Sequence, residues 1–407
     1  MRAPRIGRSA RHERAEQPIV QPIIAGIVAA ITGFSSSFAI VLAGLAAVGA
    51  TESQSASGLL VICIVQGLLS IVVSAVYRVP VKFAWSTPGA ALLVATAGVT
   101  GRFTEAVAAF IVAAALILLV GLWPALERLI TRIPRPISSA MLAGILLPLC
   151  IAPVKAAVAI PLLAIPVILV WLALYRLAPR WAVPAAIALA GVLLAVTAGS
   201  GWLAGASLAP QLVFVVPVFD PLVVVSLAIP LFIVTMAGQN IPGAAILNNF
   251  GYRAPVRSAL VSSGVLSGVG AMFGGITVNL AALTQALTAS PGASPDRSRR
   301  WIASVAAGGT YIALGLLAGV ATAFVTASPP LLIEAVAGLA LLSSLVGAVV
   351  AAVEDSAHRL AAILTFLVTA SGIVVGGVGS AFWGLLVGGL VMVWLSGGRR
   401  RARVLRP

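Results

Sequence analysis

Residues Val79–Gly98 read VPVKFAWSTPGAALLVATAG. The second half of this stretch is small and apolar, as in a membrane helix. In the first half, Pro80 and Pro88 flank aromatic residues, and both features favour extended backbone. We predict a short extended segment, a break at Ser86–Gly89 and a half-length helix that begins near Gly89. In hydrocarbon, such a break is tolerated only where the backbone is buried in protein or lines a cavity.

A second stretch, Phe273–Ala289, reads FGGITVNLAALTQALTA and repeats this plan. Gly274 and Gly275 precede the β-favouring segment Ile276–Val278, and we predict that Asn279 opens a second short helix. Interrupted segments at corresponding positions of two halves point to the substrate site of a secondary transporter. The sequence therefore predicts two half-helices that meet at one binding site.

The composition is that of a polytopic membrane protein. Of 407 residues, 61% are hydrophobic and only 9% are charged, against about 25% charged in soluble domains. The net charge of +15 does not indicate nucleic-acid binding, because the arginines lie in tails and loops, where membrane topology accounts for them. Cys63 and Cys150 lie far apart in apolar segments, and no catalytic or metal-binding set is present. We therefore expect a transporter with no cofactor or metal, and no enzyme.

At about 20 residues per crossing, the apolar segments number fourteen. Their predicted ranges are 20–48, 54–76, 82–99, 104–123, 136–151, 157–175, 182–199, 221–240, 256–272, 276–289, 301–325, 330–350, 357–370 and 373–396. With the N-terminus inside, every Lys and Arg except Arg102 and Lys155 falls on the cytoplasmic side, with Lys82 placed in a loop after the second segment. Each half of the chain has seven segments, and because this number is odd, the two halves insert in opposite orientations. The predicted fold is an all-α integral membrane protein with a seven-plus-seven inverted repeat, in which short strands precede the half-helices of spans 3 and 10.

Few polar residues lie at membrane depth, and they form the predicted substrate site. Serine hydroxyls in a span often bond the backbone carbonyl one turn earlier, and buried amides often satisfy a broken backbone. Both roles stay open here beside substrate contact. The predicted substrate-binding residues are Ser35, Ser36, Ser37, Phe38, Trp85, Ser86, Thr87, Pro88, Gly89, Gln239, Asn240, Thr277, Val278 and Asn279.

The two half-helices predict an anionic substrate. Each exposes unpaired N–H groups and the positive end of its dipole, and opposed half-helices would make an anion site without a buried cation. No Lys or Arg falls at the centre of a predicted span, so a small carboxylate fits. Nearby aromatic residues either face an aromatic ring or only pack in the core. They are Phe34, Phe38, Phe83, Trp85 and Phe273.

Proton coupling would need an ionisable group inside the membrane. Glu334 lies about one turn inside the twelfth segment and is the candidate. Asp220 precedes Pro221 at a helix start, where capping is a sufficient role.

Several blocks of this sequence together resemble the benzoate:proton symporter family (BenE), over about Gln21 to Leu395. They are GFSSSFAIVLAGLAAVGATESQSASGLL from Gly33, FAWSTPGAALLVATAG from Phe83, TMAGQNIPGAAIL from Thr235, FGGITVNLAALTQAL from Phe273, LTFLVTASG from Leu364 and GSAFWGLLVGG from Gly379. The resemblance implies that benzoate or a related aromatic carboxylate enters with a proton through a bacterial-type inner membrane. It also implies the architecture of uracil permease and of sulfate and bicarbonate carriers, with substrate between spans 3 and 10, and a homodimer through the gate.

That architecture divides the chain into two domains between cytoplasmic basic tails. The resemblance implies a core domain of residues 19–125 and 221–326, a gate domain of residues 134–199 and 328–396, and tails at 1–18 and 397–407. Nucleobase carriers of this architecture place acidic residues in the eighth and tenth spans, where this chain has neutral amides. The proton carrier therefore stays open between Glu334 and benzoate itself. The alternatives are a carrier for another carboxylate or inorganic anion, and an uncoupled channel.

Overall fold

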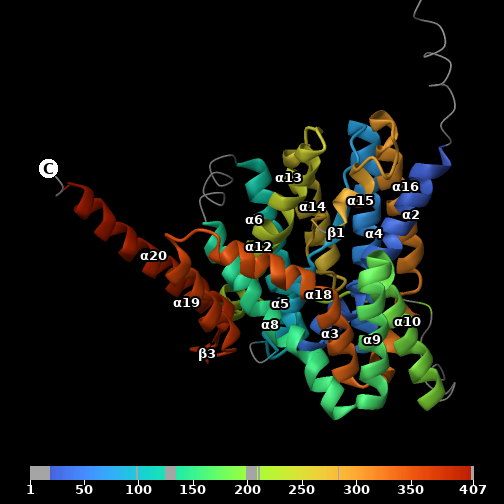
Figure 1. Ribbon diagram of the computed structural model, residues 1–407, viewed down its shortest axis with the longest axis horizontal. Helices are drawn as coiled ribbons and strands as arrows, with labels where there is room; N and C mark the ends of the chain where they lie inside the picture. Colours follow the sequence, from blue (N-terminus) through green and yellow to red (C-terminus); the bar gives the residue numbers. More distant parts are fainter. Residues whose placement is uncertain are drawn as a thin grey trace, which may run out of the picture.

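A computed structural model of the chain describes residues 19–97, 100–123, 134–198, 209, 211–282 and 284–404. The protein is a bundle of helices with two short strand pairs, in which α19 and α20 project from one end while α9 and α10 lie at the other (Figure 1). The predicted N-terminal tail at 1–18 and the loop arginines Arg128 and Arg132 lie outside the described residues.

Most elements overlap the predicted apolar segments, although the helix of the eighth segment continues beyond residue 240 to Asn249. In the first half they are α2 (Val20–Ser35), α3 (Phe38–Ala47), α4 (Glu52–Tyr77), β1 (Phe83–Trp85), α5 (Thr87–Ala95), α6 (Phe103–Leu122), α8 (Arg135–Ala159), α9 (Pro161–Leu177) and α10 (Pro179–Ala198). In the second half they are α11 (Pro221–Val223), η2 (Val224–Ala228), α12 (Ile229–Thr235), η3 (Met236–Asn240), α13 (Ile241–Asn249), α14 (Val256–Ala271), β2 (Val278–Leu280), α15 (Gln285–Ala289), η4 (Arg297–Arg299), α16 (Trp301–Gly315), α17 (Ala318–Ala327), α18 (Pro330–Val353), α19 (Arg359–Ala370), β3 (Val374–Val375), β4 (Val378–Gly379) and α20 (Ser380–Val404).

Within the described part of the chain, seven helices are long and apolar enough to cross a membrane. An eighth is added if η4–α16 and α17, bent by 59° at their junction, form one span. Large apolar side chains stay exposed along these helices, for example Val158, Val196 and Val346, as hydrocarbon surroundings require. The chain is therefore a mostly helical, multi-pass membrane protein.

Side-chain caps fix where several helices begin. The Asp220 carboxylate accepts hydrogen bonds from Leu222 N and Val223 N at the start of α11, which confirms its predicted capping role. At α4, Thr51 and Gln54 form a reciprocal capping box.

Two prolines shape the long helix Pro221–Asn249. Pro230 and Pro242 each follow a π-helical turn, at η2 and η3 respectively. Proline lacks an N–H and crowds the carbonyl four residues earlier, and a widened turn accommodates both effects. Gln239 and Asn240 therefore lie in a π turn within a continuous helix.

Strands β1 and β2 pair antiparallel and join the two halves of the chain, with Ala84 opposite Asn279. This confirms the two predicted short strands. The second half-helix, however, does not open at Asn279, because that residue lies within β2 and α15 begins only at Gln285. Side chains explain the difference, since Leu280 N donates to Asn240 Oδ1 at 2.9 Å and Ala282 N donates to Gln239 Oε1 at 3.1 Å. These bonds hold the backbone of Leu280 and Ala282 in a non-helical conformation where a helix was predicted.

Close helix packing surrounds the strand pair. Helix α16 lies against both α2 and α4, and α8 lies against α18. At the α4–α16 contact, Gly67 faces the Gly308 carbonyl so closely that an added Cβ would sit 2.7 Å from it. Glycine therefore allows these backbones to approach, as is common between membrane helices.

Candidate functional site

A small polar cavity of about 20 Å³ lies where the broken segments meet. Its walls come from the α2–α3 junction, β1, the first residue of α5, η3, the chain after β2, and α16. The lining residues are Gly33, Ser36, Ser37, Ala84, Trp85, Thr87, Gln239, Ala281, Ala282, Thr284 and Tyr311. A cavity needs roughly 10–15 Å³ to hold one water, so this space has room for about one water molecule, and an aromatic ligand fits only if the walls move.

The three serines explain the break between α2 and α3. Ser36 Oγ and Ser37 Oγ donate to the Gly33 carbonyl at 2.9 and 3.2 Å, and Ser35 Oγ donates to Ile31 O at 2.6 Å. Ser36 and Ser37 also line the cavity, whereas Ser35 does not. Trp85 Nε1 donates to Ser37 Oγ at 2.9 Å and fixes the indole against the break.

The start of α5 is bound tightly to its own cap. Gly89 N donates to Ser86 Oγ at 3.1 Å, and Pro88 has no N–H to offer. Of the first three residues of α5, only Thr87 therefore keeps an amide for a ligand, and its side chain lines the cavity. Together with the short α15, this shows that the predicted pair of helix ends with free amides is wrong.

The sequence left two roles open for Gln239 and Asn240, which are contact with substrate and hydrogen bonding to the broken backbone. Asn240 Oδ1 accepts from Leu280 N, so this amide serves the broken backbone. Gln239 Oε1 accepts from Ala282 N, and the same side chain lines the cavity. Gln239 thus has a mixed role.

The other predicted site residues lie beside the cavity without lining it: Ser35, Phe38, Ser86, Pro88, Gly89, Asn240, Thr277, Val278 and Asn279. Thr235 Oγ1 donates to Ser86 Oγ at 2.9 Å and lies 3.2 Å from Thr277 Oγ1, so these hydroxyls tie α12 to both breaks. Asn279 Nδ2 donates to Leu280 O, while the Asn279 Oδ1 atom is buried without a partner.

Aromatic rings form one side of the site. Trp85 lies edge-on to Tyr311 and to Phe34, with ring centroids 6.0 and 5.8 Å apart, and Phe34 stacks on Phe38. Phe273 instead pairs with Phe214. Of the predicted aromatic residues, Phe34, Phe38 and Trp85 therefore form one cluster beside the cavity, whereas Phe273 contributes to a different pair.

Lys82 corrects the predicted topology. Its side chain is fully buried rather than in a cytoplasmic loop. Backbone pairing continues one residue before β1, because Ala281 N donates to Lys82 O at 2.9 Å, and the Gln285 side chain accepts a hydrogen bond from Lys82 N through Oε1 at 3.0 Å. Lys82 Nζ donates to Ala29 O at 3.1 Å, and also to Thr284 Oγ1 and Tyr311 OH. The expected absence of a buried cation near the site is therefore wrong.

Glu334 lies elsewhere. It is half-buried in the first turns of α18, as predicted from the sequence, and lines neither this cavity nor the larger one described next. Among the described residues, no group of three His, Cys, Asp or Glu side chains is arranged to hold a metal ion.

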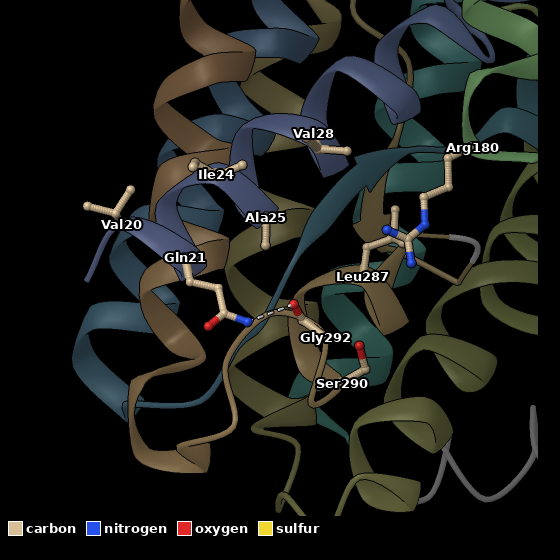
Figure 2. Close-up of a pocket in the computed structure, with 9 residues that line it drawn as sticks. All are labelled: Val20, Gln21, Ile24, Ala25, Val28, Arg180, Leu287, Ser290 and Gly292. Carbon is tan, nitrogen blue, oxygen red and sulfur yellow. Dashed lines mark hydrogen bonds between the residues drawn. The ribbon is translucent and has the colours of Figure 1, made fainter. Parts of the chain in front are cut away.

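A second, larger cavity has a volume of about 420 Å³, and Figure 2 shows the residues that line it. Its lining residues are Val20, Gln21, Ile24, Ala25, Val28, Arg180, Leu287, Ser290 and Gly292. The Arg180 guanidinium reaches in from α10 beside Leu287, and Gln21 Nε2 donates to Gly292 O at 3.5 Å (Figure 2). Helix α2 and the chain around α15 line both cavities. Val28 of the large cavity and Gly33 of the small one are only about 7–8 Å apart along α2.

Comparison with known proteins identifies the family. The family described as BenE, benzoate membrane transport protein, matches residues 17–394. Inner membrane protein YdcO of Escherichia coli (strain K12) is 40% identical over 366 residues, which cover 89% of this chain and 93% of YdcO. The benzoate membrane transport protein of Acinetobacter baylyi (strain ATCC 33305 / BD413 / ADP1) is 35% identical over 318 residues, which cover 77% of this chain and 79% of the relative. This chain belongs to the BenE family.

The fold of this BenE-family chain is similar to that of SLC26A9. The TM-score is 0.61 at 13% identity, and the match covers 93% of this chain and 66% of the SLC26A9 chain. The BenE-family chain thus spans slightly less than two thirds of that structure. Because BenE is a family of membrane transporters rather than of enzymes, the chain is a membrane transporter.

Sequence reasoning missed several residues of this BenE-family site. They are the lining residues Gly33, Ala84, Ala281, Ala282, Thr284 and Tyr311, and Lys82 behind them. One signal was available. Lys82 is the only charged residue from Val79 to Gly101, inside the stretch that decides the fold, and an ionisable residue inside a membrane span indicates function by default.

Proposed function

We propose that this chain carries benzoate or a related aromatic carboxylate across the membrane together with a proton, by alternating access. The observation that carries the proposal is the small cavity at the junction of the two broken segments. Hydroxyl groups of Ser36, Thr284 and Tyr311 line it, and the Trp85 ring forms an apolar wall. A ligand with one aromatic face and one carboxylate matches this division. Family membership and the name of the Acinetobacter relative support the same substrate.

The two cavities support alternating access. The small cavity is too small for benzoate, whereas the large cavity falls within the roughly 300–1,000 Å³ typical of ligand sites. Because α2 and the chain around α15 line both, a shift of these elements would join them. We propose that the large cavity is the path to the small one, and that the small one widens when the core moves against the gate.

The proposed topology is the fourteen-segment inverted repeat, with both termini cytoplasmic in a bacterial inner membrane. Residues 19–125 and 221–326 form the core, and residues 134–199 and 328–396 form the gate. The strand pair that joins the two halves supports a core built from both of them. Three shorter apolar helices, α9, α19 and the apolar part of α20, add to the long ones and support the larger number of segments. Two copies associate through the gate in this proposal, which cross-linking of the purified protein measures.

Transport by reconstituted vesicles tests the function. Labelled benzoate and an imposed pH gradient should give concentrative uptake that an uncoupler collapses. Downhill flux without accumulation would instead assign an uncoupled channel or carrier. Competition by unlabelled chloride, sulfate and benzoate separates the substrate classes, and only benzoate or a related aromatic carboxylate should compete strongly.

A further inference from the structure

Lys82 stands directly behind the small cavity. Its three ammonium protons are used on neutral acceptors, the Ala29 carbonyl and the hydroxyls of Thr284 and Tyr311, at 3.1, 2.5 and 3.3 Å. No carboxylate of the described residues lies within ion-pair distance of it. A buried cation that is hydrogen-bonded but lacks a counter-ion favours the entry of an anion nearby.

The two hydroxyls connect Lys82 to the cavity. A hydroxyl oxygen that accepts from an ammonium keeps its own proton for another acceptor. Thr284 and Tyr311 both line the cavity, and neither hydroxyl proton has an acceptor among the hydrogen bonds of the described residues. Both protons are therefore available to a ligand in the cavity.

Gly33 keeps this arrangement open. A Cβ added at Gly33 would overlap the Tyr311 hydroxyl and lie 3.3 Å from Lys82 Nζ. The bare backbone of α2 thus leaves space where the hydroxyl and the cavity meet.

We infer that Lys82 is the charge partner of the transported carboxylate and that it acts through the Thr284 and Tyr311 hydroxyls, which donate to the carboxylate oxygens. This inference rests on the proposed function and adds the group that selects an anion. Hydrogen bonds to a charged group are roughly twice as strong as neutral ones. A lysine that polarises both donors therefore favours the carboxylate over an uncharged ligand of the same shape.

A structural role is the competing explanation. Lys82 also links three parts of the chain, namely α2, the residue before α15, and α16. A residue that served only this purpose would affect thermal stability without affecting the preference for a charged ligand.

Binding of benzoate and of benzamide, its uncharged isostere, separates the two roles. In purified protein, Lys82→Gln should reduce the preference for benzoate over benzamide by about tenfold or more. The only other lysine, the exposed Lys155, supplies a matched control, and Lys155→Gln should keep the wild-type preference. A wild-type preference in Lys82→Gln, whatever its melting temperature, would overturn the inference.

Two further variants keep the test decisive if Lys82→Gln does not fold. Tyr311→Phe and Thr284→Val retain Lys82 and remove one hydroxyl each, and each should reduce the preference by about three- to tenfold. An unchanged preference in both would also overturn the inference.

Chloride and bicarbonate in the same assay separate this inference from the proposed function. If the wild type does not bind benzoate but binds chloride or bicarbonate, and Lys82→Gln weakens that binding, the result would contradict the proposed function and support the role of Lys82. If the wild type binds none of these anions, both are overturned.

Discussion

The two broken segments begin alike and end differently. Each starts with a three-residue strand, and the two strands pair with each other. After β1, the chain turns at Ser86 into the nine-residue helix α5, whereas the first helix after β2 is α15, which begins at Gln285 and has only five residues. The first segment caps itself through its own side chain, while the second is held by side chains from η3.

This difference changes what the site can use to hold an anion. Two helix ends would offer free backbone amides, but here most of the amides near the cavity are already bound to side chains. Besides the Thr87 amide, the groups that remain are hydroxyls, with Lys82 behind two of them. The site therefore depends mainly on side chains. Substitutions can test separately whether the first segment is stabilised by its own Ser86 cap and whether the second is stabilised by the side chains of η3.

Asn240→Ala should have the largest effect on stability. It leaves the buried Leu280 N without its acceptor, and an unsatisfied buried amide costs about 1–3 kcal/mol. Thermal unfolding in detergent measures this, with the exposed Asn249→Ala as a control on the same helix system. An unchanged melting temperature would mean that η3 does not support the second segment.

Ser86→Ala should have the next largest effect, since it removes the cap of α5 and the acceptor of the Thr235 hydroxyl. Loss of a helix cap typically costs about 1 kcal/mol. Ser86→Thr retains an acceptor and should recover part of the stability. If Ser86→Ala melts like the wild type, the first segment does not depend on its own cap.

Gln239→Ala should affect stability less and affinity more. Ala282 N is only partly buried beside the cavity, so water can replace the lost acceptor, and we expect about 0.5–1.5 kcal/mol. Because Gln239 lines the cavity and Asn279 does not, benzoate affinity should fall more in Gln239→Ala than in Asn279→Ala. The reverse order, measured by equilibrium binding, would contradict the placement of the site.

Glu334→Gln should have the smallest effect on stability and on binding, because Glu334 lies outside both cavities. If it carries the proton, the variant keeps benzoate counterflow and loses accumulation driven by a pH gradient. Normal accumulation in the variant would eliminate Glu334 and leave benzoate itself as the proton carrier.

Much of the fold could be predicted from the sequence because hydropathy and prolines act locally. The apolar segments, the strand at Phe83–Trp85, the break at Ser86 and the cap at Asp220 all follow from nearby residues. The late start of α15 could not be predicted, since it depends on Gln239 and Asn240, which are distant in sequence.

The same limit explains the errors in the site. Counting charges along the sequence places Lys82 in a loop. Only its contacts with α2 and α16 in the folded chain show that its side chain points inward. Tyr311 and Thr284 carry no motif, and their role emerges only when α16 and the chain after β2 meet at one cavity.

A structure determined with 4-bromobenzoate bound would test most directly whether the junction of the two segments is the substrate site. We predict the brominated ring beside Trp85 and the carboxylate at the hydroxyls of Thr284 and Tyr311, in a cavity wider than the present one. Bromine density only in the cavity beside Arg180, or outside both cavities, would contradict this site.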